Sequence, residues 1–438
     1  MSPLALLPEL LILAGAVAGL VTGLFVARDR QRVVAWTNGV ALAGAAAATT
    51  MNPETMAFDG YVVDRVTNVT RLTVALATIL VICLAAGRAR GDTRESELYT
   101  LVALAALGTI TMAGAGDLLV LVAAYLLASI PAYALAGFAK DAPGTEAALK
   151  YYLMGAFLGV LMLAGVTIAY GSSGATAYPE TRAPAVAAVL LLAGLLFKAG
   201  GVPAHFWVPD VAEGASRPVA AFVTTVPKIG ALAALYRLAS GVFDEPALLA
   251  VVAAATMTLG NLAAFHQDNV RRLLAYSTVS QAGYLLVPVA VAGRTDLAEP
   301  ALLFYLAAYA ITNLGAFAVV ATAGTDTLAD YAGLARRSPW TAFALVVCLL
   351  GLVGTPPTAV FAGKLLMFAA AWDGGYAWLA VLAAANTVAS VFYYLRWIRP
   401  VFAQEGGAGE SRTGAVALMA AAGSLVLGIA AGVVLLIA

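Results

Sequence analysis

Charge is what this sequence has least of. Charged residues make up 11% of its 438 residues and hydrophobic residues 62%, whereas a soluble globular chain carries roughly 25% charged residues. We therefore place the chain among membrane proteins rather than soluble ones. The 24 basic and 24 acidic residues cancel, which gives no reason to expect nucleic acid or an acidic macromolecule as a partner.

Ligands for metals and redox groups are also scarce. The two cysteines, Cys83 and Cys348, lie in long apolar runs without CxxC spacing, and the chain has only two histidines. Iron–sulfur and zinc sites need clustered Cys or His, so we expect no cofactor or metal bound by this chain itself. The amino terminus lacks the basic residues of a cleaved signal peptide and carries Glu9, so its apolar run is expected to remain as a span.

Long apolar stretches are what the sequence has in abundance. A bilayer core about 30 Å thick needs about 20 apolar residues in a helix. Fourteen stretches fit, and they are continuously apolar rather than alternating, which favours helices over membrane strands. They run approximately over 4–27, 33–50, 70–87, 97–114, 117–138, 147–170, 186–206, 218–239, 246–265, 275–292, 301–323, 340–370, 376–397 and 414–438. We predict an all-α polytopic membrane protein of about 14 transmembrane helices.

The basic residues predict the orientation of these spans. With the N-terminus outside and alternating loops, sixteen Lys and Arg residues, among them Arg88, Arg90 and Arg412, fall inside and five, Arg71 included, fall outside. The positive-inside rule favours this arrangement. The remaining three of the 24 basic residues lie within spans.

Two spans are interrupted by helix-breaking residues. The seventh contains Gly200, Gly201 and Pro203, and the twelfth contains Pro356 and Pro357. Unwound backbone at membrane depth is tolerated only where protein or a water-filled cavity satisfies the freed groups. The bland alternative is that Pro and Gly are simply frequent in membrane helices.

The spacing of the interruptions predicts a repeat. They are five helices apart, as in transporters built from inverted repeats, which favours two five-helix units with broken helices 7 and 12. The expected domains are 1–95 for helices 1–3, 96–240 for helices 4–8, 241–400 for helices 9–13 and 401–438 for helix 14.

Three lysines within the spans are the leading functional candidates. Lys198 and Lys228 lie near the middle of theirs, where a lysine costs roughly 2.5–3.5 kcal/mol. Desolvation penalises the charged form of a buried amine, so such a lysine can trade a proton. Lys364 lies nearer a span end, where snorkelling to the interface is an alternative. Because none of the 24 carboxylates lies at mid-span, the lysines must be neutral part of the time, hydrated or paired with a neighbouring subunit.

Other polar and aromatic groups allow two interpretations. Glu146 and Lys150 form a favourable i,i+4 pair near the start of helix 6, either functional or an ordinary interfacial ion pair. His205, just after the helix 7 break, is placed either to pass protons near neutral pH or to be a hydrogen-bonded interfacial histidine. Six aromatic residues at span ends fit interfacial belts: Tyr151, Tyr152, Trp207, Trp340, Trp378 and Trp397.

Several long motifs carry a resemblance to a known family. The longest resembles the hallmark block of the antiporter-like subunits of respiratory complex I, most of all subunit N: LLFKAGGVPAHFWVPDVAEGASRPVAAFVTTVPKIGAL. The resemblance continues through EAALKYYLMGAF, TLGNLAAFHQDNVRRLLAYSTVSQAGY, YLAAYAITNLGAFAVV, DYAGLARRSPW and GLVGTPPTAVFAGKLLMF. It covers about residues 95 to 400 in one order, which is specific for the proton-conducting transporter superfamily.

The resemblance implies a function and roles for residues. The chain would be a membrane-arm subunit of an NADH:quinone oxidoreductase, moving protons while partner subunits reduce quinone. Lys198 and Lys228 match the family's central relay lysines and Lys364 its terminal one, while Lys150 and His205 match further polar positions. Implied partners are M-like, K-like and neighbouring antiporter-like subunits and the lipid bilayer. The implied location is the cell inner (plasma) membrane.

One position departs from the family pattern. The family has a glutamate in helix 5 within a block resembling ELxSLxxY, whereas residues 126–133 read LLASIPAY, so Leu126 stands in its place. Asp117 is nine residues away, about 13 Å along a helix, and cannot substitute without a water chain. We therefore predict that Leu126→Glu changes the stoichiometry or the pH dependence of proton pumping.

Two other functions remain open. A cation/proton antiporter or ion-coupled uptake subunit of the same superfamily would show sodium-dependent transport. A non-conducting structural subunit is suggested by the missing glutamate, although the presence of three costly membrane lysines argues against it.

Overall fold

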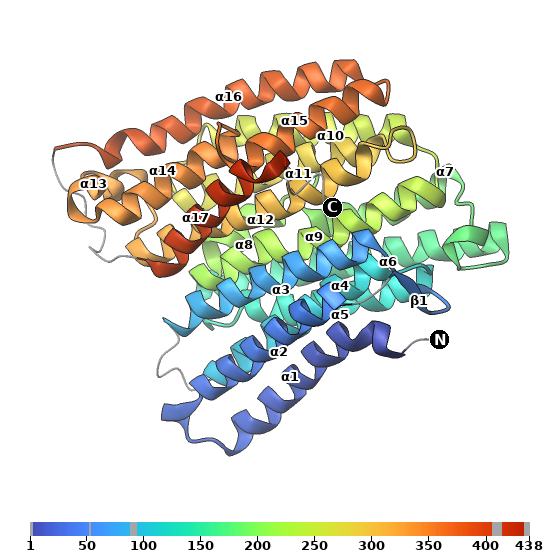
Figure 1. The fold of residues 1–438 in the computed structure, drawn as a ribbon, viewed down its shortest axis with the longest axis horizontal. Helices are drawn as coiled ribbons and strands as arrows, with labels where there is room; N and C mark the ends of the chain where they lie inside the picture. Colours follow the sequence, from blue (N-terminus) through green and yellow to red (C-terminus); the bar gives the residue numbers. More distant parts are fainter. Residues whose placement is uncertain (1–2, 52–53, 88–93, 405–413, 433–438) are drawn as a thin grey trace. The chain divides into compact units, whose positions relative to one another are not determined.

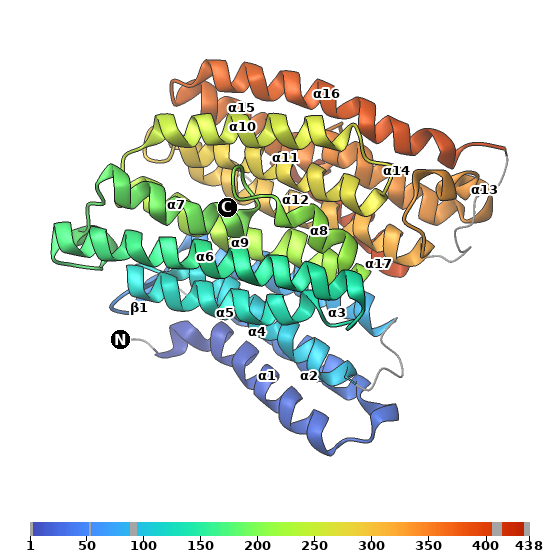
Figure 2. The same ribbon diagram turned by 180° about the vertical axis from the view of Figure 1, so that it is seen from behind.

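The computed structural model describes residues 3–51, 54–87, 94–404 and 414–432, which are helical almost throughout (Figures 1 and 2). The first helices are α1 (Leu7–Phe25), α2 (Arg32–Met51), α3 (Arg65–Ala86), α4 (Glu95–Gly114), α5 (Leu118–Ala136), α6 (Ala142–Ser173), α7 (Ala185–Ala199) and α8 (Trp207–Gly214). They are followed by α9 (Arg217–Gly241), α10 (Pro246–Ala264), α11 (Val270–Ala290), α12 (Ala298–Ala323), α13 (Leu334–Arg337), α14 (Pro339–Val353), α15 (Ala359–Asp373), α16 (Ala377–Val401) and α17 (Ala415–Ile429). Short 3-10 turns occupy Pro3–Leu6, Arg28–Arg30, Tyr178–Glu180 and Leu328–Tyr331.

The helical, multi-pass character expected from the sequence is confirmed. Among the described residues, eleven helices are long and apolar enough to cross a membrane, and α7, α14 and α17 are shorter apolar helices. Each of the fourteen expected stretches contains at least one helix. The number of membrane crossings and the inverted repeat stay predictions. Of the basic residues used for orientation, Arg88, Arg90 and Arg412 lie outside the described residues.

A short hairpin corrects the expectation of helices alone. Strand β1 (Thr55–Phe58) pairs antiparallel with β2 (Tyr61–Val63) through a two-residue turn, in which Gly60 has a φ of 97°. The turn is Asp-Gly, the dipeptide most typical of tight hairpins. This signal was present in the sequence, between apolar residues that are too few to span a membrane.

The helices form two compact units. The first comprises residues 1–199 and 214–245, and the second comprises residues 200–213 and 246–438. The chain passes between them inside the broken seventh span, since α7 belongs to the first unit while the turn after it belongs to the second. The domain boundaries expected from the sequence are a different division and stay predictions.

Each unit is built around helices that are buried on nearly all sides. In the first unit α9 packs against α4, α3 and α7, and Figure 2 shows α6 lying along α5 and α7. In the second unit α11 packs against α10 and α12. Glycines permit the close approach: a Cβ on Gly230 would lie 2.2 Å from Thr109 O, and one on Gly283 would lie 2.3 Å from Met257 N. Small residues at contacts between membrane helices allow this backbone proximity.

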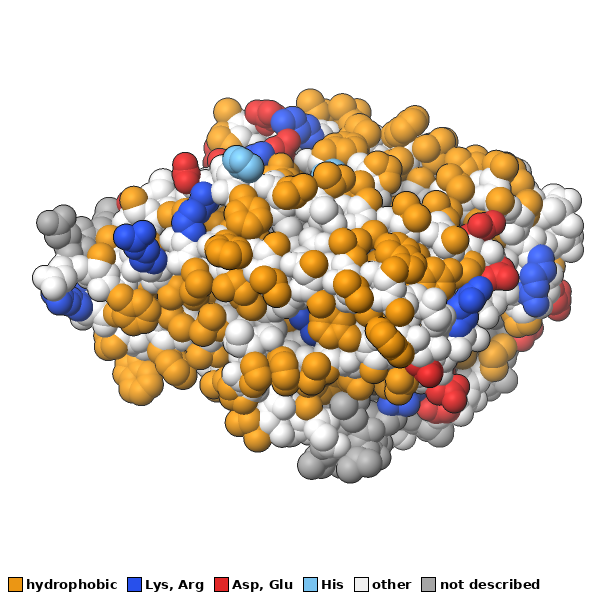
Figure 3. Space-filling view, turned by 90° about the horizontal axis from the view of Figure 1, so that it is seen from above, with side chains coloured by type: hydrophobic (Ala, Val, Ile, Leu, Met, Phe, Trp, Pro, Cys, Tyr) orange, Lys and Arg blue, Asp and Glu red, His pale blue; other side chains and the backbone are white. Residues whose placement is uncertain are grey.

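The outer surface suits a lipid environment. Hydrophobic side chains cover most of the face shown in Figure 3, and charged side chains gather in a few groups toward its margins. Large exposed apolar residues occur along α1, α6, α10 and α16, for example Leu24, Phe157, Val251 and Phe392. Such a surface would be an aggregation hazard in water and is ordinary in a bilayer.

Candidate functional site

Each of the two broken spans contains a helix that ends at a glycine in the left-handed region. Helix α7 ends at Ala199, before Gly200 with a φ of 72°, and α14 ends at Val353, before Gly354 with a φ of 91°. Glycine adopts this conformation without steric cost. The last carbonyls of a helix have no partner within it, so both breaks leave backbone acceptors at depth.

A lysine ammonium occupies each of these helix ends. Lys228, on α9, donates from Nζ to Ala199 O at 2.8 Å. Lys364, on α15, donates from Nζ to Val353 O at 2.8 Å. A helix C-terminus carries a partial negative charge that favours a cation. The sequence offers no carboxylate at mid-span to balance these two lysines. The partial negative charges at the ends of two broken helices supply part of that balance.

Burial settles the alternative interpretation of Lys364. The residue is 2% exposed and its ammonium group bonds inside the second unit. Snorkelling of this side chain to the interface is therefore the wrong interpretation. Lys198 and Lys228 are both 0% exposed, as their mid-span positions predicted.

Lys198 lies in a cage formed by neighbouring helices of the first unit. Its Nζ donates to Ser129 Oγ at 2.7 Å and to Ala128 O at 3.1 Å, both on α5. Three tyrosine rings surround the ammonium, with centroids 5.6–6.0 Å away: Tyr125, Tyr133 and Tyr151. Aromatic faces attract cations at this range. The recorded partners of Lys198 in the described chain are thus a hydroxyl, a carbonyl and rings, with no carboxylate.

Tyr151 corrects one part of the expected aromatic belt. It was assigned to the membrane interface, but it is fully buried and packs edge-on against Tyr133. Trp207 and Trp397 are also fully buried, whereas the side chains of Tyr152, Trp340 and Trp378 are exposed as a belt requires. A tyrosine beside a buried lysine is indistinguishable from a belt tyrosine by sequence position alone.

Leu126, where the resemblance to the family implied a glutamate, directly follows Tyr125 of the cage. Tyr125, Ser129 and Tyr133 follow one another at intervals of four residues and so share one face of α5. Leu126 is not on that row, and its side chain is 48% exposed in this chain. The hydrogen bonds and ring contacts of Lys198 described above do not involve the side chain at position 126.

Lys364 has a chain of neutral polar neighbours. Its Nζ also donates to Thr387 Oγ1 at 3.1 Å, and it lies 4.2 Å from the centroid of the Tyr284 ring. Thr387 donates to the Tyr284 hydroxyl at 3.4 Å. Gln281 donates to Leu352 O at 2.8 Å and accepts from the Tyr305 hydroxyl at 2.6 Å. The last two carbonyls of α14, Leu352 O and Val353 O, thus accept hydrogen bonds from an amide and an ammonium group.

Helix α11 carries further polar residues that were not singled out from the sequence. Ser277 shares a hydrogen bond of 2.5 Å with Tyr394, and Ser280 donates to Asn261 Oδ1 at 2.9 Å. Thr278 accepts from Tyr309 at 3.3 Å. The signal was available, because YSTVSQAGY places four serine, threonine or glutamine side chains and two tyrosines within one apolar span. With Gln281 and Tyr284 they make up a group of buried polar side chains inside the second unit.

Lys150 and His205 are more exposed than the three membrane lysines. Lys150 forms the expected ion pair with Glu146 at 2.8 Å, and its side chain is 46% exposed on α6. His205 lies half-buried in the turn between α7 and α8, within the second unit. The structure therefore joins Lys198 and Lys228 through consecutive residues of α7, Lys198 itself and Ala199.

A buried ion pair in the first unit was missed altogether. Arg71, counted above as an outer-side residue, is 1% exposed and donates to both carboxylate oxygens of Glu9, each at 2.7 Å. The Tyr61 hydroxyl also donates to Glu9 at 2.7 Å. Burial, and secondarily the Glu9 carboxylate, raises the pKa of Tyr61, which keeps it a neutral donor. Removing one partner of a buried ion pair of this kind strongly destabilises the folded state, because the other charge is left buried without a partner.

Known proteins share the sequence and the fold of this chain. Residues 115–391 match the family described as NADH:quinone oxidoreductase/Mrp antiporter, transmembrane. The chain is 54% identical to NADH-quinone oxidoreductase subunit N 1 of Streptomyces griseus, covering 99% of this chain and 97% of that one. It is 52% identical to subunit N of a Mycobacterium species, with the same coverage. The chain belongs to the subunit N family of NADH-quinone oxidoreductase.

Solved structures agree with this membership. A chain of respiratory complex I from Thermus thermophilus is 34% identical, has a TM-score of 0.88 and matches over 98% of each chain. A chain of the Mrp complex from a Dietzia species has a TM-score of 0.86 at 22% identity, over 99% of this chain and 96% of that one, which shows a shared fold alone. This subunit N chain is thus a multi-pass membrane protein of a multi-subunit respiratory enzyme.

Proposed function

We propose that this subunit N chain translocates protons across the membrane through a lysine and water relay, coupled to quinone reduction in partner subunits. The observation that carries the proposal is the repeated lysine at a broken helix end, Lys228 on Ala199 O and Lys364 on Val353 O. A buried amine that can dock on a helix end when charged and leave it when neutral is suited to handing on protons.

The contacts within the first unit support an order of groups along the relay. Lys228 extends from α9 to the end of α7, and Lys198 extends from α7 to α5. The two lysines thus link three helices in turn, α9 to α7 and α7 to α5. In the second unit Lys364 leads through Thr387 to Tyr284 on α11. Lys150 and His205 are assigned to the ends of the path, where a half-exposed group can exchange protons with solvent or a neighbouring subunit.

The wider setting of the chain is part of the same proposal. We place its N-terminus outside the cell inner (plasma) membrane, because the basic residues of the sequence then fall mainly inside. M-like and K-like subunits would be its neighbours in the membrane. The redox cofactors would be held by partner subunits, so that this chain contributes proton transfer and no electron transfer to the translocase.

The test replaces the lysine at the first helix end in the intact enzyme. Lys228→Met keeps the length of the side chain and removes the ammonium, while Lys140→Met, at an exposed loop lysine, is the matched control. In proteoliposomes, we expect Lys228→Met to lower NADH-driven proton pumping at least about tenfold, with Lys140→Met unchanged. Subunit assembly, checked by gel filtration, must be equal in both variants.

Two outcomes would favour the other functions. Unchanged pumping in assembled Lys228→Met enzyme would contradict the relay and favour a structural subunit. Transport that requires sodium in the external buffer, and disappears when choline replaces it, would favour a cation/proton antiporter, the activity of the other branch that the family description names.

A further inference from the structure

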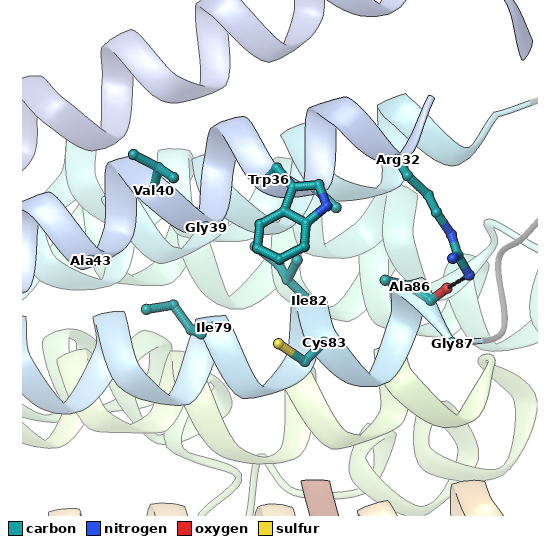
Figure 4. A pocket seen from close by; sticks show the side chains of 11 residues that line it. Arg32, Trp36, Gly39, Val40, Ala43, Ile79, Ile82, Cys83, Ala86 and Gly87 are labelled. Carbon is teal, nitrogen blue, oxygen red and sulfur yellow. Dashed lines mark hydrogen bonds between the residues drawn. The ribbon is translucent and has the colours of Figure 1, made fainter. Parts of the chain in front are cut away.

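A groove opens on the surface of the first unit between α2 and α3 (Figure 4). It has a volume of about 510 Å3 and is lined mainly by apolar side chains: Trp36, Val40, Ile79, Ile82 and Cys83. None of the lysines discussed above contributes to it. Small residues, including Gly39 on α2, form its floor and keep it open.

One end of the groove is basic. Arg32, the first residue of α2, lines it and donates from Nη2 to Ala86 O at 2.7 Å, as the dashed line in Figure 4 marks. Among the described residues its Nε has no hydrogen-bond partner. Arg28 and Arg30 lie in the exposed 3-10 turn just before α2, with the acidic residue Asp29 between them. The Nε of Arg32 is buried, but the residue as a whole is half-buried and lines the groove. A partly exposed arginine at the edge of a membrane is a ready partner for phosphate oxygens.

The length of the groove can be compared with the thickness of the bilayer. Arg32 and Ala43 both line it and are eleven residues apart on α2, which is about 16 Å along the helix. The hydrocarbon core of a bilayer is about 30 Å thick, so the groove spans one leaflet from its basic end. A transmembrane helix of a partner subunit would need a groove through both leaflets, whereas an acyl chain occupies one.

We propose that this groove binds one anionic phospholipid, with an acyl chain between α2 and α3 and the headgroup phosphate on Arg32. The exposed ring of Trp36 lies along the chain. The bound lipid covers the groove that remains on the surface of the first unit between these two packed helices.

The experiment uses the fluorescence of Trp36, one of six tryptophans. Full-length chain in detergent is titrated with phosphatidylglycerol or phosphatidylcholine brominated on the acyl chains, and the Trp36 signal is the difference between the wild type and Trp36→Phe. We expect phosphatidylglycerol to quench Trp36 at a mole fraction about fivefold lower than phosphatidylcholine. Arg32→Gln should remove that preference.

A groove-filling variant distinguishes a site from ordinary surface lipid. A Cβ on Gly39 meets no atom within 4 Å, so Gly39→Leu fills the groove without disturbing the fold. It should abolish saturable quenching. The matched control is Gly171→Leu on α6, where a Cβ also meets open space, and it should leave quenching unchanged.

Three results would overturn the proposal. Equal quenching by the two lipids in the wild type would show annular lipid without a site, and so would saturable quenching that survives Gly39→Leu. In the intact enzyme, a Gly39→Cys variant that cross-links mainly to another subunit would show that protein covers the groove. Loss of proton pumping plays no part in these readouts, so they stand apart from the relay.

Discussion

The two broken helices hold a lysine in the same way but surround it differently. In both, the last helical carbonyl before a left-handed glycine accepts from an ammonium at 2.8 Å. The first unit adds a second lysine, Lys198, in a cage of tyrosines on the neighbouring helices. The second unit has no second lysine at its break; an amide, Gln281, takes the adjacent carbonyl of α14.

This difference separates what a helix break requires from what a relay adds. A break at membrane depth needs donors for its freed carbonyls, and either an ammonium or an amide satisfies that need. In the proposed relay, charge is needed only where protons move. The caged Lys198 would then give the first unit a second exchangeable proton, whereas the hydrogen bonds of the second unit lead from one lysine to hydroxyl groups.

The largest expected effect comes from removing the single lysine of the second unit. Lys364→Met takes away the only ammonium recorded at the end of α14 in the described chain, and no second lysine is present there to replace it. We expect proton pumping to fall at least about tenfold, as for Lys228→Met. Pumping in proteoliposomes, normalised to quinone reduction, measures it. Normal pumping in Lys364→Met alone would show that the two helix ends are not equivalent.

The second prediction tests the glycine that exposes the carbonyl. Gly354→Ala forces a left-handed alanine, which costs about 1–2 kcal/mol, and it places a Cβ 2.9 Å from Lys364 Cδ. Gly375→Ala is the control, because Gly375 has a φ of 84° with nothing within 4 Å of its Cβ position. Both should lower thermal stability similarly, but only Gly354→Ala should reduce pumping, by several fold. Equal pumping in the two variants would contradict a role for the Lys364 position.

Sequence reasoning located the lysines and the breaks but not their partners. Lys228 was expected at depth because a charged residue in the middle of an apolar run is conspicuous, whereas for Lys364 snorkelling to the interface was an alternative. Gly and Pro announce both breaks. The acceptors, Ala199 O and Val353 O, are backbone atoms, and no residue type marks them. These two carbonyls accept an ammonium only because a particular helix packs against each break, and the tertiary structure determines which helix that is.

Other gaps have equally physical causes. The Glu9–Arg71 pair joins residues 62 apart, so neither position alone signals the contact, and each looked like a flank of its own span. The hairpin at β1 and β2 was missed although Asp59-Gly60 announced it, because hydropathy was read with a window suited to whole spans. The helical class and the interrupted spans were predictable since they depend on local composition.

The third prediction compares the hydroxyl partners of the two lysines. Ser129→Ala removes one of two hydrogen bonds of Lys198 and leaves the three rings. Thr387→Val removes a bond of Lys364 and also the link to Tyr284. A hydrogen bond to a charged group is worth about 1.5–3 kcal/mol, so Thr387→Val should lower pumping by up to about tenfold and Ser129→Ala by less. The opposite order would mean that the tyrosine cage does not hold Lys198.

The smallest expected effect concerns Leu126, where relatives would have a glutamate. The side chain at 126 is half-exposed and lies off the row formed by Tyr125, Ser129 and Tyr133, so a carboxylate there would reach the edge of the cage rather than its centre. Leu126→Glu should therefore change the pumping rate by less than about twofold, the interaction of a half-exposed charge pair being worth about 0–1 kcal/mol.

Its signature should appear in the pH profile. Glu titrates and Gln does not, so Leu126→Glu should alter the pH dependence of pumping while Leu126→Gln matches the wild type. Identical profiles for both would show that position 126 is electrically separate from Lys198. A change well above twofold would show that the carboxylate at position 126 reaches Lys198. In the wild type, the tyrosine cage and the end of α7 would then stand in for that carboxylate.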